Sequence, residues 1–128
     1  MGEFKFHHMH FLSRNPRAAA EYYHKMFNAQ ILESVQSDGK TRIDLDMDGV
    51  KIFIMPIPAD RTIAEAPSDY YIGLDHFGLI VKNMDETVAE LKRKGAEFAE
   101  EPRVFRAGVK IAYVRAPENV RIEIVEHS

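Results

Sequence analysis

An internal repeat constrains the fold of this chain more than any other feature of its sequence. His8 stands seven residues before Asn15, and His76 stands seven residues before Asn83. In both places a strand-like segment leads into a helix-like segment that opens at the asparagine. Such self-similarity indicates that the chain is built from two copies of one supersecondary unit.

Each copy contains a short amphipathic helix with a recognisable start. Asn15 is a favoured N-cap residue, and Pro16 suits the first helical position because its missing N–H is not needed there. Asn83 is followed three residues later by Glu86, which is a capping-box pattern. Apolar residues then recur at helical spacing, at Ala19, Tyr23, Met26 and Phe27 in the first helix and at Val88 and Leu91 in the second. One apolar face on each helix predicts that each lies on a sheet.

Strand-like segments follow both helices. They span residues 31–36, 41–47 and 50–55 in the first half and residues 97–100, 109–114 and 121–125 in the second. In the first half the strands are separated by Asp38-Gly39 and Asp48-Gly49, where glycine supplies the positive φ that tight hairpin turns require. Each half therefore reads β-α-β-β-β.

The stretch between the halves reads as a linker, because Pro58 and Pro67 stand among small and charged residues. We therefore predict an α+β fold with a first module over residues 1–58, a linker over residues 59–70 and a second module over residues 71–128. The two modules together are expected to form one functional domain.

Composition excludes several classes of function. The net charge of −3 offers no strongly basic face for nucleic acid, and no apolar run approaches the roughly 20 residues that span a bilayer. The N-terminus also lacks the pattern of a secretion signal. Because the chain has no cysteine, any metal must be bound by nitrogen and oxygen. We expect a cytoplasmic protein that binds neither nucleic acid nor membrane.

Alternation along the strands singles out three polar side chains. Side chains in a strand point to opposite faces in turn, so His8 and His76 should face away from the helices. Glu123 stands between two isoleucines, and a carboxylate in apolar surroundings is costly to bury without a partner. We predict that His8, His76 and Glu123 meet in one open cleft and bind a metal ion.

Each of these residues taken alone has a simpler interpretation. A single histidine in a strand is commonly a satisfied core or surface residue, and a strand glutamate often faces water. His7, His24 and His127 are interpreted as surface residues. Equivalent histidines in two repeats, together with a carboxylate in the last strand, favour the metal site and leave these alternatives open.

The order of short motifs along nearly the whole chain resembles a known family. The first half contributes His8, Asn15-Pro16, Tyr22-Tyr23 and Phe27-Asn28-Ala29. The second half contributes Asp75-His76-Phe77-Gly78, Asn83, Gly95-Ala96, Ala116-Pro117-Glu118-Asn119 and Ile122-Glu123-Ile124. Their order and spacing resemble the vicinal oxygen chelate superfamily, which includes glyoxalases, bleomycin-resistance proteins and extradiol dioxygenases.

This resemblance implies that the two βαβββ modules curve into a half-barrel around a divalent metal ion, with the helices on the outer face. In metal-binding members the ligands come from the first and last strands of each module. Three of the four ligand positions then hold His8, His76 and Glu123. The fourth holds Phe53, which can neither bind a metal nor carry a proton. His10 is the candidate substitute ligand or catalytic base, and Tyr22 and Phe53 are candidates to line the substrate pocket.

Two histidines and one carboxylate leave coordination positions open, so a small substrate could chelate the metal through two adjacent oxygens. The resemblance therefore implies a glyoxalase-like lyase or isomerase. Its alternatives are an Fe(II) dioxygenase of the extradiol type and a bleomycin-resistance-like protein that only binds a small molecule. The metal is expected to be Fe, Zn, Mn or Ni, and the protein is expected by analogy to be a homodimer.

Overall fold

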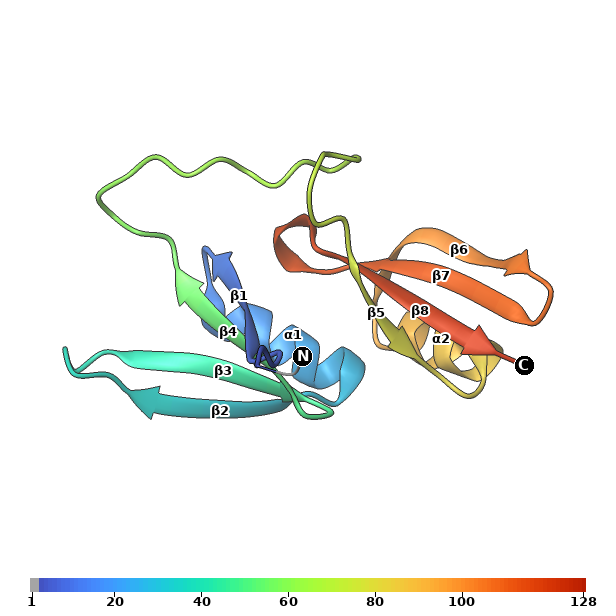
Figure 1. The fold of residues 1–128 in the computed structure, drawn as a ribbon, viewed down its shortest axis with the longest axis horizontal. Coiled ribbons are helices and arrows are strands. Elements are labelled where there is room, and N and C mark those ends of the chain that lie inside the picture. The colour runs from blue at the N-terminus through green and yellow to red at the C-terminus, as the bar shows by residue number, and fades with distance from the viewer. Residues whose placement is uncertain (1–2) are drawn as a thin grey trace. The chain divides into compact units, whose positions relative to one another are not determined.

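The computed structural model describes residues 3–128 and contains the predicted repeat (Figure 1). The first copy consists of β1 (His8–Ser13), α1 (Pro16–Phe27), β2 (Gln30–Val35), β3 (Thr41–Met47) and β4 (Val50–Pro56). The second consists of β5 (Phe77–Ile80), α2 (Met84–Arg93), β6 (Glu97–Arg106), β7 (Val109–Arg115) and β8 (Arg121–His127), with a short 3-10 helix at Pro117–Asn119 before β8. The predicted α+β class with two βαβββ modules is confirmed.

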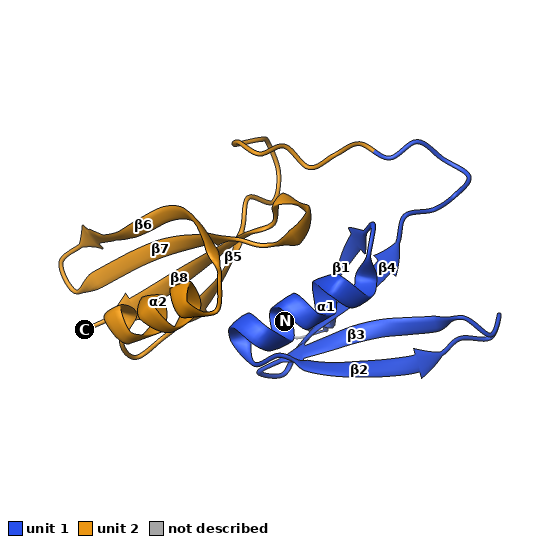
Figure 2. Cartoon of the chain, turned by 180° about the vertical axis from the view of Figure 1, so that it is seen from behind, with its two compact units in different colours: residues 1–63 blue, residues 64–128 orange. Residues whose placement is uncertain are grey.

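The chain divides into two compact units, Met1–Ile63 and Ala64–Ser128 (Figure 2). Each unit holds one open four-stranded sheet, with strand order β1-β4-β3-β2 in the first and β5-β8-β7-β6 in the second. In each sheet the first strand runs parallel to the last, and the remaining neighbours are antiparallel. A single helix covers one face of each sheet and leaves the other face open (Figures 1 and 2).

The helix ends follow local side-chain chemistry. The side-chain oxygens of Asn15 and Asn83 each accept a hydrogen bond from the backbone N–H three residues on, at 3.1 and 3.0 Å. These bonds satisfy N–H groups that have no partner inside a helix. At the other end of α1, Asn28 adopts the left-handed conformation with φ of 59°. Both predicted N-caps are confirmed.

The core of each unit lies between its helix and the covered face of its sheet. Fully buried side chains include Tyr23, Leu45, Ile52 and Ile54 in the first unit and Met84, Leu91, Val114, Ile122 and Ile124 in the second. Because strand side chains alternate, the residues between these positions, including Phe53 and Glu123, point to the open face and are only half-buried. The open faces therefore carry the side chains that are available for chemistry.

The second strand of the second unit, β6, is longer than the predicted segment 97–100. β6 continues to Arg106, and its pairing with β7 shifts register between Glu100 and Arg103. Pro102 is tolerated there because β6 is an edge strand. The proline and the irregular register interrupt the alternation of apolar and polar residues, so the sequence pattern predicted too short a strand.

No helix in the described chain, residues 3–128, is long and apolar enough to cross a membrane.

We expect Ile124→Ala to lower the free energy of unfolding by about 2–5 kcal/mol, because it removes a buried side chain and leaves a cavity. Ile80→Ala is the matched control on the neighbouring strand. Its side chain is 69% exposed, so the change should stay within about 0.5 kcal/mol. Urea unfolding followed by circular dichroism measures both, and equal losses would contradict this assignment of the core.

Candidate functional site

The second unit joins a histidine to two carboxylates. His76 lies immediately before β5, and its Nε2 is 3.0 Å from Oε1 of Glu123, which projects from β8. Its Nδ1 is 2.7 Å from Oδ2 of Asp75. When Nδ1 carries the proton donated to Asp75, the lone pair of Nε2 points toward the Glu123 carboxylate. A histidine nitrogen and a carboxylate oxygen therefore lie side by side on the second unit.

Arg121 fixes Asp75 from the start of β8. Its Nη1 donates to both carboxylate oxygens of Asp75, at 3.0 and 2.8 Å. The hydrogen bond from His76, together with the charge of Arg121, lowers the pKa of Asp75 below its ordinary value. Asp75 is therefore an ionised carboxylate at neutral pH, and it can orient the imidazole of His76.

Two aromatic rings enclose the Arg121 guanidinium. The rings of Tyr70 and Tyr113 each have their centre 4.6 Å from its Cζ, within cation–π range. Nη2 also lies 3.4 Å from Oε2 of Glu100. With a side chain only 9% exposed, Arg121 is the most buried charge of the cluster. From β8 it thus contacts Tyr70 of the linker, Tyr113 of β7 and Glu100 of β6.

Tyr113 completes the cluster beside the histidine. Its ring stands edge-on to the ring of His76, with centroids 5.0 Å apart. Burial and the negative charge of Glu123 raise the pKa of Tyr113 above its ordinary value. The phenol therefore keeps its proton at neutral pH and can act as a hydrogen-bond donor on the open face of the sheet.

The charge of this cluster suits a bound cation. Asp75, Glu100 and Glu123 bring three negative charges against the positive charges of Arg121 and of Arg103, which pairs with Glu100, and this leaves one negative charge when His76 is neutral. Metal–nitrogen and metal–oxygen bonds are about 2.0–2.2 Å long, so two such ligands at a right angle stand about 3 Å apart. The 3.0 Å between Nε2 of His76 and Oε1 of Glu123 fits that spacing, as it also fits a hydrogen bond. A carboxylate on the other ring nitrogen is the usual partner of a metal-binding histidine.

The profile of the Glyoxalase/Bleomycin resistance protein/Dioxygenase superfamily matches residues 7–113 of the sequence. The chain belongs to this superfamily. The match covers most of both units, from the residue before His8 to Tyr113.

Several solved structures share the fold of this chain. A glyoxalase family protein from Enterococcus faecalis is 23% identical, with a TM-score of 0.76 over 98% of this chain and 100% of that one. TioX from Micromonospora sp. ML1 is 17% identical, with a TM-score of 0.71 over 98% and 100%. A variant of the fosfomycin resistance protein FosX from Listeria monocytogenes, complexed with Mn(II) and 1S,2S-dihydroxypropylphosphonic acid, is 17% identical, with a TM-score of 0.69 over 100% and 93%. A comparison with curated proteins gave no match.

In this superfamily member the predicted site residues fall into two groups. His76 and Glu123 are brought together in the second unit. His8, His10 and Phe53 gather on the open face of the first sheet, where His10 is in register with Phe53. Within either unit, the described residues contain no group of three or more histidine, aspartate or glutamate side chains that could hold a metal.

Tyr22 lies apart from the open face of the first sheet. It is half-buried on α1, where its ring stands edge-on to the rings of Tyr23 and Phe27. Phe53, its predicted companion in a substrate pocket, is on β4. The two residues therefore come from different layers of the first unit.

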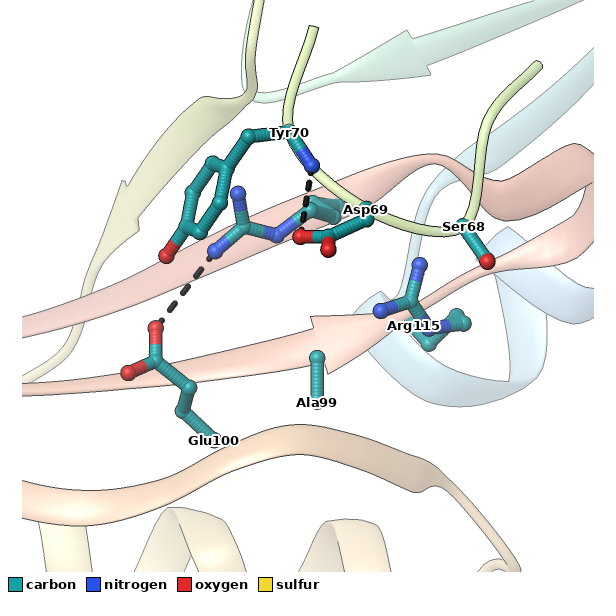
Figure 3. Close-up of a pocket in the computed structure, with 7 residues that line it drawn as sticks. Ser68, Asp69, Tyr70, Ala99, Glu100 and Arg115 are labelled. Carbon is teal, nitrogen blue, oxygen red and sulfur yellow. Dashed lines mark hydrogen bonds and ion pairs between the residues drawn. The ribbon is translucent and has the colours of Figure 1, made fainter.

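A pocket of about 140 Å³ adjoins the Arg121 cluster. It is lined by Ser68, Asp69, Tyr70, Ala99, Glu100, Arg115 and Arg121. Figure 3 shows the linker residues Ser68, Asp69 and Tyr70 on one side of this pocket and Ala99, Glu100 and Arg115 from the strands on the other. Arg121 both lines this pocket and holds Asp75, whereas His76 and Glu123 are not among the residues that line it.

Sequence reasoning missed several members of this cluster. Asp75 directly precedes His76, and Arg121 shares the strand face of Glu123, so adjacency and alternation could have found both. Tyr113 is opposite Glu123 in the β7–β8 register, which only the strand pairing reveals. Tyr70 belongs to the linker, and Glu100 lies at the register shift of β6, so no periodic pattern pointed to either.

We expect Arg121→Met to lower the free energy of unfolding by about 2 kcal/mol, because it leaves Asp75 and Glu100 without their shared cation. Arg103→Met is the matched control. Arg103 also faces Glu100, at 3.9 Å, but it is 52% exposed, so its loss should cost less than about 1 kcal/mol. Equal costs in chemical unfolding would contradict the central role of Arg121.

Proposed function

We propose that this protein is a metal-dependent enzyme that acts on a small substrate bound through two adjacent oxygens, as glyoxalase-like lyases and isomerases do. One observation carries the proposal: Nε2 of His76 and Oε1 of Glu123 are 3.0 Å apart, while Asp75 holds Nδ1 of the same ring. The net negative charge of the cluster supports a bound cation. The ion is Fe, Zn, Mn or Ni.

His8 is the proposed third ligand. It occupies the same place in the first repeat as His76 in the second, and its side chain is exposed on the open face of its sheet. Phe53, at the fourth ligand position that the superfamily resemblance implies, has no donor atom. Two histidines and one carboxylate therefore form the protein's ligand set, which leaves room for two substrate oxygens.

A bound divalent metal supplies Lewis acidity, which stabilises negative charge on a substrate oxygen. The chain's own residues supply the rest. Asp75 keeps His76 in the tautomer that presents Nε2, and Arg121 keeps Asp75 in place. The protonated phenol of Tyr113 donates a hydrogen bond to negative charge as it develops. His10 is the proposed base that takes and returns a substrate proton.

The substrate class is a small polar molecule. The pocket beside Arg121 encloses about 140 Å³ and offers guanidinium, hydroxyl and carboxylate groups, so it suits a substrate with few non-hydrogen atoms. The FosX complex holds Mn(II) and a small molecule with hydroxyl groups on adjacent carbons. That pairing supports a divalent metal with a vicinal-oxygen ligand here.

A dioxygenase is the second candidate. Two histidines and one carboxylate are the ligand set of non-haem Fe(II) oxygenases. Phe53 cannot supply a fourth protein ligand, which favours such a three-ligand site. The third candidate is a protein that binds a small molecule without catalysis, as bleomycin-resistance proteins do.

Protein purified without chelator is expected to retain about one metal ion per chain, measured by elemental analysis. His76→Ala and Glu123→Gln should each weaken metal binding in calorimetric titration by more than about 100-fold, because each removes a direct ligand. His127→Ala is the control, since His127 is an exposed histidine near the end of β8. Full metal occupancy in His76→Ala would show that the ligand assignment is wrong.

Asp75→Asn should weaken metal binding less than His76→Ala does. It keeps both ligands of the second unit and removes only the carboxylate that orients His76, so affinity should fall by about 10–100-fold. A loss as large as that of His76→Ala would mean that Asp75 is itself a ligand.

Activity assays on the metal-loaded protein separate the two reaction types. Isomerisation of hemithioacetals without oxygen consumption is the expected result, and His10→Ala should lower kcat while leaving metal affinity unchanged. Oxygen uptake with catechols would instead establish the dioxygenase. Stoichiometric binding of a vicinal diol or catechol with neither activity would favour the binding protein.

A further inference from the structure

We propose that Phe53, held by Arg42, is a positioning residue that fixes the imidazole of His8 on the open face of the first sheet. The inference rests on the proposed function, because it treats His8 as a metal ligand. It assigns a role to the one superfamily ligand position at which this chain has no donor atom.

The strand order places Phe53 between two neighbours. β4 lies between β1 and β3, and Phe53 is in register with His10 on β1 and with Asp44 on β3. Its neighbours in sequence, Ile52 and Ile54, are fully buried under the helix, so its own ring stands on the open face. Side chains from both adjacent strands can therefore contact that ring.

His8 makes the first of these contacts. The centroids of the His8 and Phe53 rings are 4.1 Å apart, and the ring planes are inclined by only 22°, so the rings are stacked. His8 is exposed, and an exposed imidazole without such a contact would exchange among several rotamers. Stacking on Phe53 selects one of them.

Arg42 makes the second contact. Its guanidinium carbon lies 4.2 Å from the centre of the Phe53 ring, within cation–π range. The guanidinium is itself fixed by a two-point ion pair with Asp44, with Nε–Oδ1 and Nη2–Oδ2 distances of 2.9 Å. Such paired bonds fix the plane of the arginine. The chain of contacts thus runs from buried Asp44 through Arg42 and Phe53 to His8.

His8 also contacts the neighbouring His7 through its Nδ1 atom. Nδ1 of His8 lies 2.7 Å from Nδ1 of His7. A His8 that donates through Nδ1 keeps the lone pair of Nε2, which is also the atom that His76 presents in the second unit. The two repeats then offer equivalent nitrogens, one oriented by a carboxylate and the other by a stacked ring. A ligand held in place before binding loses less conformational entropy when it binds.

Nuclear magnetic resonance of the metal-free protein tests the stack directly. In the wild type the carbon-bound ring protons of His8, assigned by their loss in His8→Ala, should be shifted upfield by the ring current of Phe53. Phe53→Leu should move them back toward the positions of an exposed histidine, and Phe53→Tyr, which keeps the ring, should leave them shifted. The His76 protons should not move in either variant.

Metal titration of the same variants tests the consequence. Phe53→Leu should weaken metal binding by about 10-fold, the lower end of the range for residues that orient a ligand, and Phe53→Tyr should stay near the wild-type affinity. Phe11→Leu is the matched control, because it makes the same change on β1 at a half-buried position that faces the helix side. It should alter neither the His8 resonances nor the metal affinity.

The outcomes separate this inference from the proposed function. Unshifted His8 protons in the wild type, or wild-type metal affinity in Phe53→Leu, would overturn the positioning role and leave the metal site standing. A wild type that binds no divalent metal would overturn both.

If Phe53→Leu does not fold, Arg42→Gln provides the same two measurements, because it keeps the Phe53 ring and removes the guanidinium that contacts it. A reduced shift and weaker binding are expected, and no change in either would overturn the role of Arg42.

Discussion

The parallel pairing of the first and last strands in each unit is the constraint on which the rest of the structure depends. In the second unit, β5 beside β8 brings His76 to Glu123, 47 residues later in the chain. In the first unit the same connection puts β1 beside β4, which allows His8 to stack on Phe53. Because the helix covers the other face of each sheet, the side chains that meet through this pairing remain accessible. One repeated connection thus produces two places where distant residues meet on an open surface.

Electrostatics then distinguish the two units. The second unit concentrates carboxylates around one buried arginine, and ionised groups of one sign in a partly buried site are costly without a counter-charge. Arg121 offsets part of that cost by bonding Asp75 and Glu100 while two tyrosine rings cover it. The Glu123 carboxylate, beside His76, carries negative charge that a bound cation would balance. Stability and the proposed chemistry therefore depend on the same arginine, which acts on the histidine through Asp75.

The first unit differs from the second at the equivalent position. Phe53 has neither charge nor donor atom, and its ring instead contacts a histidine on one strand and an arginine on another. A superfamily fold defines where such a position lies but leaves its chemistry free, because function depends on the side chains at the site. The two units therefore differ at this position, with a carboxylate in the second and an aromatic ring in the first.

The sequence by itself determined the two βαβββ repeats, the N-caps at Asn15 and Asn83, and the faces on which His8, His76 and Glu123 lie. These features depend on neighbours within about four positions, through capping and strand alternation. Only the tertiary structure decided that Arg121 bonds Asp75, that Arg121 contacts the rings of Tyr70 and Tyr113, and that β6 continues past Pro102. Those contacts depend on strand register, on a shift within β6 and on the path of the linker. Each brings together residues far apart in sequence whose meeting no local pattern records.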